Sequence, residues 1–336
     1  MRFLLDPEQR DFARALDALL TASDTPALVR AWEAGDHGPG RALWQRVADA
    51  GLFAPAVPET FAGAGVLPVE LVVAFHQLGR HAVPGPYVET AAAAVLLADT
   101  PLAAEWLPRI AVGEAMVTLA EGGGCALDAD VAEAVFVLSP DPLLAPPGGE
   151  PHVSVDGARR LYRPHAGEPV PVPPASVARA REVARLLTAA QALGVGDALL
   201  AQTVSYTKQR TQFGVPIGSF QAVKHRLADT LIGLEFARPL LYGAALGMSG
   251  PDIAAAKVSA GEAAYAAART ALQLHGAVGY TRELDLSLWL RKARPLRDAW
   301  GTPGACRARV VEAQAVAAQA IAAGTRPPFR PPFRPP

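Results

Sequence analysis

Arg210, Gln212 and Phe213 are the residues of this chain whose types and spacing are best suited to binding a ligand. They lie where a helical pattern ends, in the run SYTKQRTQFGVPIGSF. A guanidinium can hold a phosphate through two parallel hydrogen bonds, an amide can add another, and a ring can stack on an aromatic group. The three residues therefore suit a phosphate-bearing aromatic ligand. An exposed helical hairpin with an ordinary charged tip would show the same spacing.

Long helices must position this turn. Before it, apolar residues recur with a helical period at Val183, Leu186, Leu187, Ala190 and Leu193. That pattern predicts a first helix over 186–208, which Gly214, Pro216 and Gly218 then interrupt. A second helix is expected over 219–247, with a kink at Pro239, and a third after the turn at 249–251. Long antiparallel helices with short connections predict a four-helix bundle within residues 176–323.

The rest of the chain divides into three further parts. Residues 1–115 are predicted to be helical, and Asp6-Pro7-Glu8 is a typical helix start. Residues 116–175 are predicted to form a short β segment, with strands at 135–139 and 151–157 and a proline-rich linker at 167–176. The proline-rich tail, 324–336, is expected to be disordered. The fold class predicted is therefore mainly α.

Composition excludes several classes of function. With 336 residues, of which 51% are hydrophobic, the chain can bury a large core. A net charge of -1 gives no electrostatic reason to bind nucleic acid or an anionic membrane surface. Apolar runs such as 90–98 are too short to span a bilayer, and the acidic start lacks a signal-peptide pattern. The cysteines and histidines show no metal-ligand spacing. We expect a cytoplasmic protein without a metal site.

The whole run over 205–229, SYTKQRTQFGVPIGSFQAVKHRLAD, resembles the C-terminal signature of the acyl-CoA dehydrogenase family, YTxxRxQFGxPIxxFQxVxHxLAD. The N-terminal run LWQRVADAGLFAPAVPETFAGAG is similar to the helical domain of the same family. The resemblance implies an N-terminal helical domain, a β-domain that covers a flavin, and a C-terminal bundle. It also implies FAD-dependent 2,3-desaturation of an acyl-CoA, with an electron acceptor such as an electron-transfer flavoprotein.

By this resemblance, several residues would contact the flavin. Arg210 would hold its pyrophosphate, beside Gln212 and Phe213, and Gln221 would contact it from the next helix. The run QLHGAVGY resembles a QxxGGxGY loop that approaches the flavin of a neighbouring subunit. The positions implied there are Gln273, Gly276 and Ala277. Gly301 and Thr302 are implied in the loop that ends the later run LRKARPLRDAWGT.

Two charged clusters have open interpretations. Glu182 and Arg185 lie one helical turn apart, which fits an ordinary ion pair. In the family, a similar pair lies near the acyl-CoA chain, so a substrate-binding role is equally open. The basic run Arg291, Lys292, Arg294 and Arg297 is expected to form a solvated or inter-subunit face, or to reach CoA phosphates.

The expected catalytic base is missing from both positions that the resemblance implies. Desaturation of a thioester requires a base for the α-proton while the β-hydrogen leaves as hydride. In LRKARPLRDAWGT, Trp300 occupies the place of the family's glutamate, and an indole has no free lone pair that could accept the proton. The other family position, on the first bundle helix, is Ala184.

The middle segment also departs from the family. Residues 119–134, LAEGGGCALDADVAEA, replace its TEPxAGSD-like motif, and no tryptophan strand follows. The flavin-covering wall is therefore expected to be depleted or missing.

Together these features resemble the reduced subunit of heteromeric bacterial steroid and sterol side-chain acyl-CoA dehydrogenases. That resemblance implies a paralogous partner subunit that supplies the base and the flavin-covering domain. A homomeric enzyme with a displaced base and a non-catalytic acyl-CoA or flavin-binding scaffold remain as alternatives. The sequence does not identify the acyl group.

Overall fold

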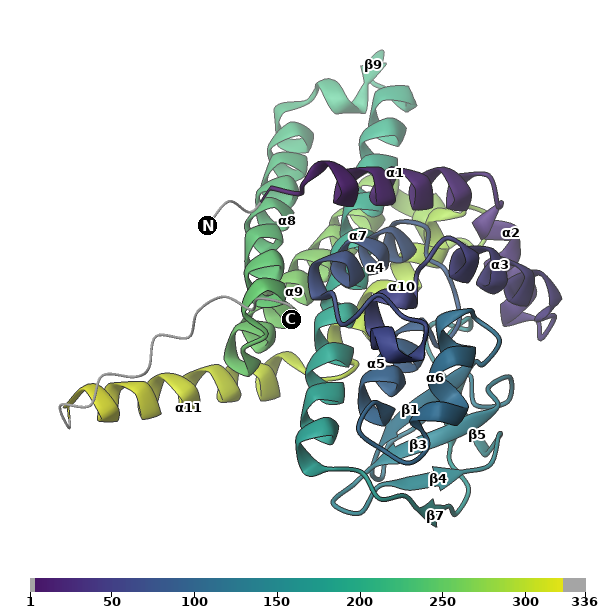
Figure 1. The fold of residues 1–336 in the computed structure, drawn as a ribbon. Helices are drawn as coiled ribbons and strands as arrows, with labels where there is room; N and C mark the ends of the chain where they lie inside the picture. Colours follow the sequence, from purple (N-terminus) through teal and green to yellow (C-terminus); the bar gives the residue numbers. More distant parts are fainter. Residues whose placement is uncertain (1–3, 323–336) are drawn as a thin grey trace.

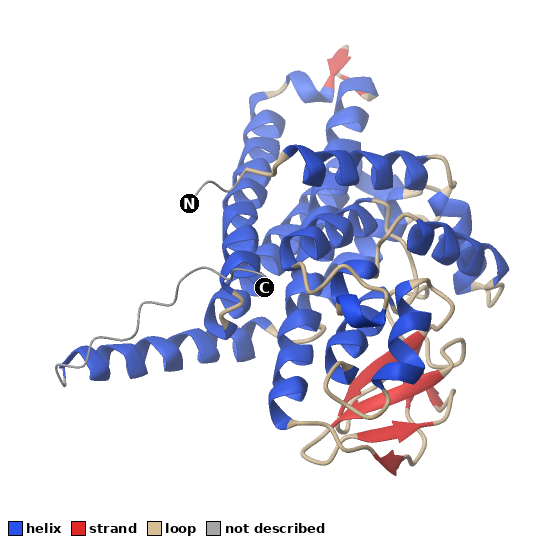
Figure 2. Cartoon of the chain, viewed as in Figure 1, coloured by secondary structure: helices blue, strands red, loops and turns tan. Residues whose placement is uncertain are grey.

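The computed structural model describes residues 4–322, and the predicted proline-rich tail lies outside them. Helices make up most of the fold, and the strands gather at one end of the molecule except for a small hairpin at the opposite end (Figures 1 and 2). The prediction of a mainly α fold is confirmed.

The N-terminal part is helical, as predicted. Asp6 begins the first helix with a capping box, because its carboxylate accepts from the backbone of Gln9 and the Gln9 side chain accepts from the backbone of Asp6. The α-helices of this part are α1 (Pro7–Thr21), α2 (Thr25–Glu33), α3 (Gly38–Asp49), α4 (Pro68–Arg80), α5 (Tyr87–Leu97) and α6 (Ala103–Ala111). Two short 3₁₀ turns, η1 (Ala54–Ala56) and η2 (Glu59–Phe61), lie between α3 and α4. Every residue of α5 is buried, so this helix runs through the interior.

The middle segment forms two small sheets. Its strands are β1 (Val117–Glu121), β2 (Ala126–Leu127), β3 (Ala134–Leu138), β4 (Leu143–Ala145), β5 (Glu150–His152), β6 (Leu161–Arg163) and β7 (Glu168–Pro169). One sheet has the order β1-β3-β4-β7, with β1 parallel to β3, and the other has the order β2-β6-β5. The middle segment is therefore a small β-domain of short strands, as the predicted fold class has it.

Two local predictions in this segment are corrected. The strand expected over 151–157 ends at His152, because Val153 and Val155 are exposed rather than paired in a sheet. The expected linker over 167–176 contains β7 and the first residues of the next helix. That helix starts at Pro174, earlier than the predicted Leu186, and proline is favourable in the first turn of a helix.

The C-terminal part is the predicted helical bundle. Its helices are α7 (Pro174–Gln209), α8 (Gln221–Gly247), α9 (Gly250–His275) and α10 (Leu286–Asp298), followed by α11 (Pro303–Ala322), which extends away from the body (Figure 1). Helix α7 is long and apolar enough to cross a membrane, but 78% of its most apolar window is buried in this fold. Between α7 and α8, the strands β8 (Thr211–Gln212) and β9 (Val215–Pro216) form a hairpin, which is followed by the turn η3 (Ile217–Ser219).

Glycines allow α4 and α7 to approach closely. A Cβ atom on Gly194 of α7 would lie 2.0 Å from the carbonyl oxygen of His76, and one on Gly79 of α4 would lie 2.1 Å from that of Gln191. Real Cβ atoms do not come so close to backbone, so each helix needs the glycine of its own face. This contact joins the N-terminal helices to the bundle.

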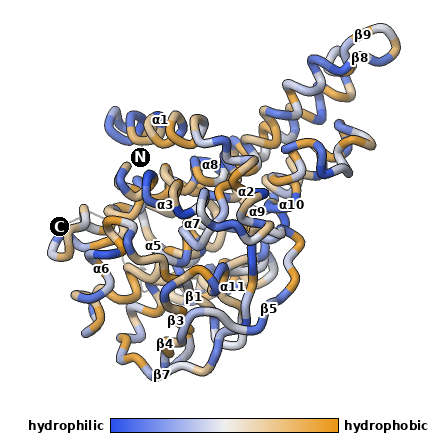
Figure 3. Tube along the Cα trace, turned by 90° about the vertical axis from the view of Figure 1, so that its right-hand side faces the viewer, coloured by the Kyte–Doolittle hydropathy of each residue, from blue (hydrophilic) through white to orange (hydrophobic). Residues whose placement is uncertain are grey.

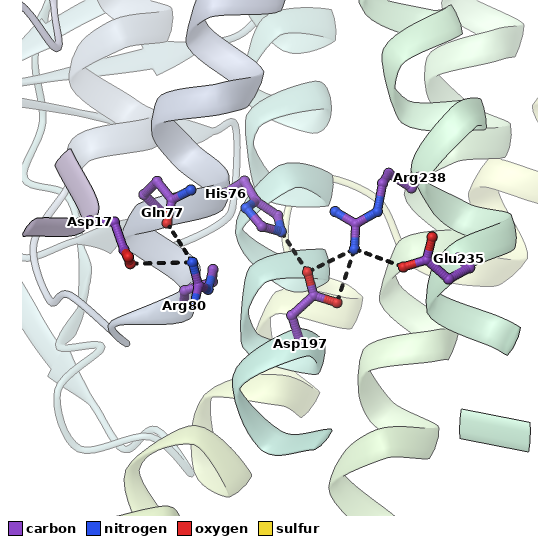
Figure 4. A network of polar contacts seen from close by, with 7 residues as sticks. All are labelled: Asp17, His76, Gln77, Arg80, Asp197, Glu235 and Arg238. Carbon is purple, nitrogen blue, oxygen red and sulfur yellow. Dashed lines mark hydrogen bonds and ion pairs between the residues drawn. The ribbon is translucent and has the colours of Figure 1, made fainter. Parts of the chain in front are cut away.

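A polar network crosses the same junction (Figure 4). Asp197 of α7 accepts from His76 of α4 at 2.7 Å and from Arg238 of α8 at 3.0 Å. Burial favours the neutral acid, but the hydrogen bond from His76 and the charges of His76 and Arg238 outweigh it and hold the pKa of Asp197 below its ordinary value. On the other side of α4, Arg80 donates to Asp17 of α1 and to Gln77. The network thus fixes α1, α4 and α8 relative to α7.

We predict that Gly194→Ala lowers the free energy of unfolding by about 1–3 kcal/mol, because the added methyl group must push the His76 backbone away. Urea unfolding followed by circular dichroism measures this change. Gly233→Ala on α8 is the matched control, since its Cβ would meet only Ala263 at 3.9 Å. The control should be neutral or slightly stabilising. Equal effects from the two substitutions would contradict the close contact.

Candidate functional site

A cavity of about 480 Å³ lies where the middle segment meets the buried helix α5 and the bundle. Its wall combines apolar side chains with a few charged ones, which is typical of small-molecule sites. The charged and polar residues that line it are Glu89, Glu121, Ser154, Arg159 and Arg185. The remaining lining residues are Leu119, Ala120, Gly124, Cys125, Leu127, Leu161, Pro295, Ala299, Trp300 and Gly301. The cavity therefore contains the position where the sequence predicts a missing base.

Trp300 contributes its indole to this cavity and bonds to a carboxyl group there. The indole Nε1 donates to Oε1 of Glu89 at 3.0 Å. Glu89 comes from the buried helix α5 and is only 3% exposed, and its second oxygen, Oε2, has no hydrogen-bond partner. The residue at the expected base position is thus a hydrogen-bond donor to an acid from another element.

The loop that carries Trp300 is held from two sides. Arg185 of α7 donates from Nε to the carbonyl oxygen of Trp300 at 3.0 Å. The buried ammonium of Lys257 donates to the carbonyl oxygens of Leu296 and Arg297 at 2.9 and 2.7 Å, and burial lowers the pKa of Lys257 to about 8. Trp300 itself has φ +56, a conformation that non-glycine residues rarely adopt. These bonds stabilise that strained backbone.

The other sequence-predicted residues near this loop have mostly structural partners. Glu182 forms the predicted ion pair with Arg185 at 2.9 Å and a second one with Arg309. Because Arg185 also lines the cavity, the ion-pair and the ligand-contact interpretations apply together. Ala184 is fully buried, and Thr302 accepts from the backbone of Ala305 at the start of α11.

Burial and charge act in opposite directions on Glu89. Burial raises the pKa of the Glu89 carboxyl, while the positive charge of Arg159 and the hydrogen bond from Trp300 oppose that rise without cancelling it. The side chain of Arg159 has no hydrogen bond or ion pair with any residue in 4–322, so its charge acts on Glu89 only at a distance. The cavity therefore holds an acid whose pKa is raised and a cation whose side chain has no direct partner within residues 4–322.

The predicted phosphate-binding residues lie far from this cavity. Arg210 ends α7, 25 positions after Arg185, so the two are separated by about 37 Å along the helix axis. Figures 1 and 3 show the β8–β9 hairpin at the far end of the projecting helices in both views. Arg210, Gln212 and Gln221 are exposed there, and Phe213 is 92% exposed with φ +53. These residues cannot serve the cavity of their own chain.

The glycine loop after α9 lies at the same end of the bundle. The ring of Tyr206, in the last turn of α7, stacks on His275 at 4.1 Å, and its hydroxyl donates to the carbonyl oxygen of His275 at 3.4 Å. Gln273, Gly276 and Ala277 are exposed beside this contact. Gly276 has φ +63, and nothing lies within 4 Å of where its Cβ would be, so its backbone is open to a ligand. We name this exposed surface, formed by 210–221 and 273–277, the bundle tip.

The bundle tip fits part of a flavin nucleotide. The exposed guanidinium of Arg210 suits a pyrophosphate, the amides of Gln212, Gln221 and Gln273 can hydrogen-bond to it, and the open backbone at Gly276 allows close approach. Only one side of such a ligand would be covered. The rest of the pocket would have to come from another chain.

The basic run is mostly not solvated, so that expectation is wrong for three of its four members. Arg291 makes two hydrogen bonds to Glu33 of α2, and Lys292, only 5% exposed, pairs with Asp156 at 3.1 Å. Arg297 lies over the ring of Tyr265. Arg294 is exposed. Arg291 and Lys292 thus join the bundle to the N-terminal and middle parts, because their acidic partners lie there, whereas Arg297 packs within the bundle.

Glu89 and Arg159 are the site residues that the sequence analysis missed. Glu89 had a signal: it is the one charged residue of YVETAAAAVLL, and a buried ionisable group in such a run is uncommon without a partner. Arg159 had none, because it lies in an irregular turn of the middle segment.

Comparison with known proteins identifies the family. The acyl-CoA dehydrogenase N-terminal domain model matches residues 6–114, and the C-terminal domain model matches 176–321. The acyl-CoA dehydrogenase IpdE2 of Mycobacterium tuberculosis is 34% identical over 293 residues, which cover 85% of this chain and 91% of that protein. The chain belongs to the acyl-CoA dehydrogenase family. It is thus related to oxidoreductases, and the predicted resemblance is confirmed.

Two solved acyl-CoA dehydrogenase structures have the same fold. The ChsE4-ChsE5 complex from Mycobacterium tuberculosis contains a chain with 25% identity and a TM-score of 0.81, covering 94% of this chain and 99% of that one. A variant of the Tcur3481-Tcur3483 steroid ACAD gives 25% identity and a TM-score of 0.82, covering 93% and 99%.

We predict that the Glu89 carboxyl makes stability depend on pH. Above its ordinary value of 4.5, the unfolded chain releases the proton while the folded chain keeps it. The free energy of unfolding of the wild type should therefore fall, relative to Glu89→Gln, as pH rises from 4.5 towards the folded-state pKa. Urea unfolding of both proteins at a series of pH values measures the difference. A difference that stays constant across pH would contradict a protonated Glu89.

Proposed function

We propose that this chain is one subunit of a heteromeric, FAD-dependent acyl-CoA dehydrogenase that desaturates an acyl-CoA thioester between C2 and C3. A paralogous partner chain supplies the catalytic base and the flavin-covering β-domain. The observation that carries the proposal is the separation of about 37 Å between Arg210, at the bundle tip, and Arg185, beside the cavity that contains Trp300. One chain therefore exposes cofactor-binding groups that its own cavity cannot use.

The chemistry of the cavity also supports a catalytic base that comes from a partner chain. Removal of the α-proton needs a side chain that can accept it. Trp300 is a hydrogen-bond donor, and Ala184, at the other family position, is fully buried and has no polar group. Glu182 is engaged by two arginines. The acyl group must then be desaturated in a pocket where another chain provides the base.

At the bundle tip, this chain would hold the pyrophosphate side of FAD. Arg210, Gln212, Phe213 and Gln221 would do so together with the loop at 273–277, while Gly301 and Thr302 remain with the cavity. FAD supplies the hydride acceptor when it is bound. The residues of this chain bind and orient it through charge and backbone approach, and an electron acceptor such as an electron-transfer flavoprotein would reoxidise it.

The similar proteins favour a steroid-derived acyl group. One similar structure is titled a steroid ACAD, and another is a complex of two differently named chains, ChsE4 and ChsE5. We therefore assign this chain to a heteromeric enzyme of steroid degradation in the cytoplasm.

A homomeric enzyme with a displaced base is the second candidate, and Glu89 is the observation that favours it. This carboxyl lines the cavity and its Oε2 has no partner, whereas Glu182 is not among the lining residues and its Oε1 pairs with two arginines. The candidate requires turnover by the chain alone, with the turnover abolished in Glu89→Gln. If the chain is a non-catalytic scaffold, in contrast, the flavin content and activity of any complex should not change when Arg210 is replaced.

We predict that the chain purified alone contains little flavin and does not turn over acyl-CoA, and that co-expression with the partner gives a yellow, active complex. In that complex, Arg210→Ala should weaken FAD binding by about 10- to 100-fold, because a charge-assisted contact is lost. Flavin absorbance and dye-linked dehydrogenase activity measure both effects.

Lys208→Ala is the control for this experiment, because it removes a neighbouring exposed charge from the last turn of α7. It should leave flavin content unchanged. Stoichiometric FAD and normal turnover from the lone chain would refute the heteromeric proposal. Unchanged flavin in the Arg210→Ala complex would favour the scaffold.

A further inference from the structure

Two complementary groups face the cavity without touching each other. The side chain of Arg159 has no ion pair or hydrogen bond with any residue in 4–322, yet its charge acts on Glu89. Oε2 of Glu89 has no partner, although this residue is only 3% exposed. A buried polar atom without a partner is costly, and so is a cation in a partly enclosed site. The space between Arg159 and Glu89 therefore suits a polar group that bonds to both.

The surroundings define the rest of such a ligand. Leu119, Leu127 and Leu161 line the cavity together with the Trp300 ring. The other charged groups of the wall already have partners. The carboxylate of Glu121 accepts hydrogen bonds from Nε and Nη2 of Arg181. Arg185 donates to Glu182 and to the carbonyl oxygen of Trp300. Among the charged groups of the wall, Arg159 and Oε2 of Glu89 thus remain free for a ligand with an apolar body.

We propose that this cavity binds a small apolar carboxylic acid as its carboxylate, held between Arg159 and Glu89, with its hydrocarbon body against the leucines and Trp300. The ligand is bound without being transformed, because the cavity has no base of the usual kind. Binding belongs to this chain alone and does not depend on a partner subunit, so it can be tested separately from the proposed desaturation.

The chemistry of the two groups selects a carboxylate over a neutral alcohol. The guanidinium of Arg159 only donates. Burial raises the pKa of Glu89 and so favours its neutral acid, in which the partnerless Oε2 also donates, so the pair presents donors from two sides. A carboxylate offers one oxygen to each, and its charge neutralises Arg159. An alcohol would leave that charge uncompensated.

Isothermal titration of the full chain with adamantane-1-carboxylate and with 1-adamantanemethanol tests this assignment. The two probes share a rigid apolar body and differ in the polar group. We expect the carboxylate to bind one site per chain, and the alcohol to bind at least about tenfold more weakly, because a charge-assisted contact is worth about 1.5–3 kcal/mol. This comparison needs no variant, so it stands even where a substitution disturbs folding.

Variants then locate the site. Arg159→Gln should weaken carboxylate binding by about tenfold or more, whereas Arg163→Gln, an exposed arginine on β6, should not change it. Glu89→Gln should retain binding, because the amide still donates. Equal binding of acid and alcohol, absence of binding by either, or an unchanged affinity in Arg159→Gln would each overturn the proposal. Turnover of the complex with its partner is independent of all three outcomes.

Discussion

The rest of the structure depends on α7, because this single helix of 36 residues sets a fixed distance between its two ends. The helix carries Glu182 and Arg185 at the cavity and ends in Arg210 at the bundle tip, about 37 Å further along its axis. Glycine contacts with α4 and the ion pairs of Asp197 fix its position in the body. No bending within one chain can bring the two ends to a common ligand. The features expected of one active site are therefore divided between two places.

This division gives the two ends different chemistry. The cavity end is enclosed, and there Trp300 donates to a buried acid instead of offering a base. The tip end is open, with an exposed guanidinium, amides and an accessible glycine backbone. The cavity lacks a catalytic base, and the bundle tip can cover only one side of a cofactor. Both features are expected if the tip completes the flavin pocket of a partner chain and the cavity only binds a ligand. In the proposed heteromer, this chain would thus contribute part of a shared redox site and keep a separate ligand-binding cavity.

The sequence predicted the helix break at Gly214–Gly218 and the ion pair of Glu182 and Arg185 well, because in both cases residues close together in the chain set the geometry. The cofactor-binding role of the bundle tip and the empty base position at Trp300 rest on the family resemblance and stay predictions. Prediction from the sequence failed where contacts join distant segments. Glu89 and Arg159 come from distant segments and line the same cavity only in the folded chain. The expected strand over 151–157 ends early because its valines face solvent. From sequence, the basic run is expected on a solvated or inter-subunit face or at CoA phosphates, because Glu33 and Asp156, the partners of Arg291 and Lys292, lie far away in sequence.

The central claim is that a flavin pocket is shared between this chain and a different one. The most direct measurement is the FAD content of the purified complex, determined from flavin absorbance and from the quantity of each chain. The account predicts one FAD for each pair of unlike chains, because only the partner's pocket is complete and this chain adds its bundle tip to it. Two FAD molecules per pair, with flavin also in the cavity beside Trp300, would contradict it.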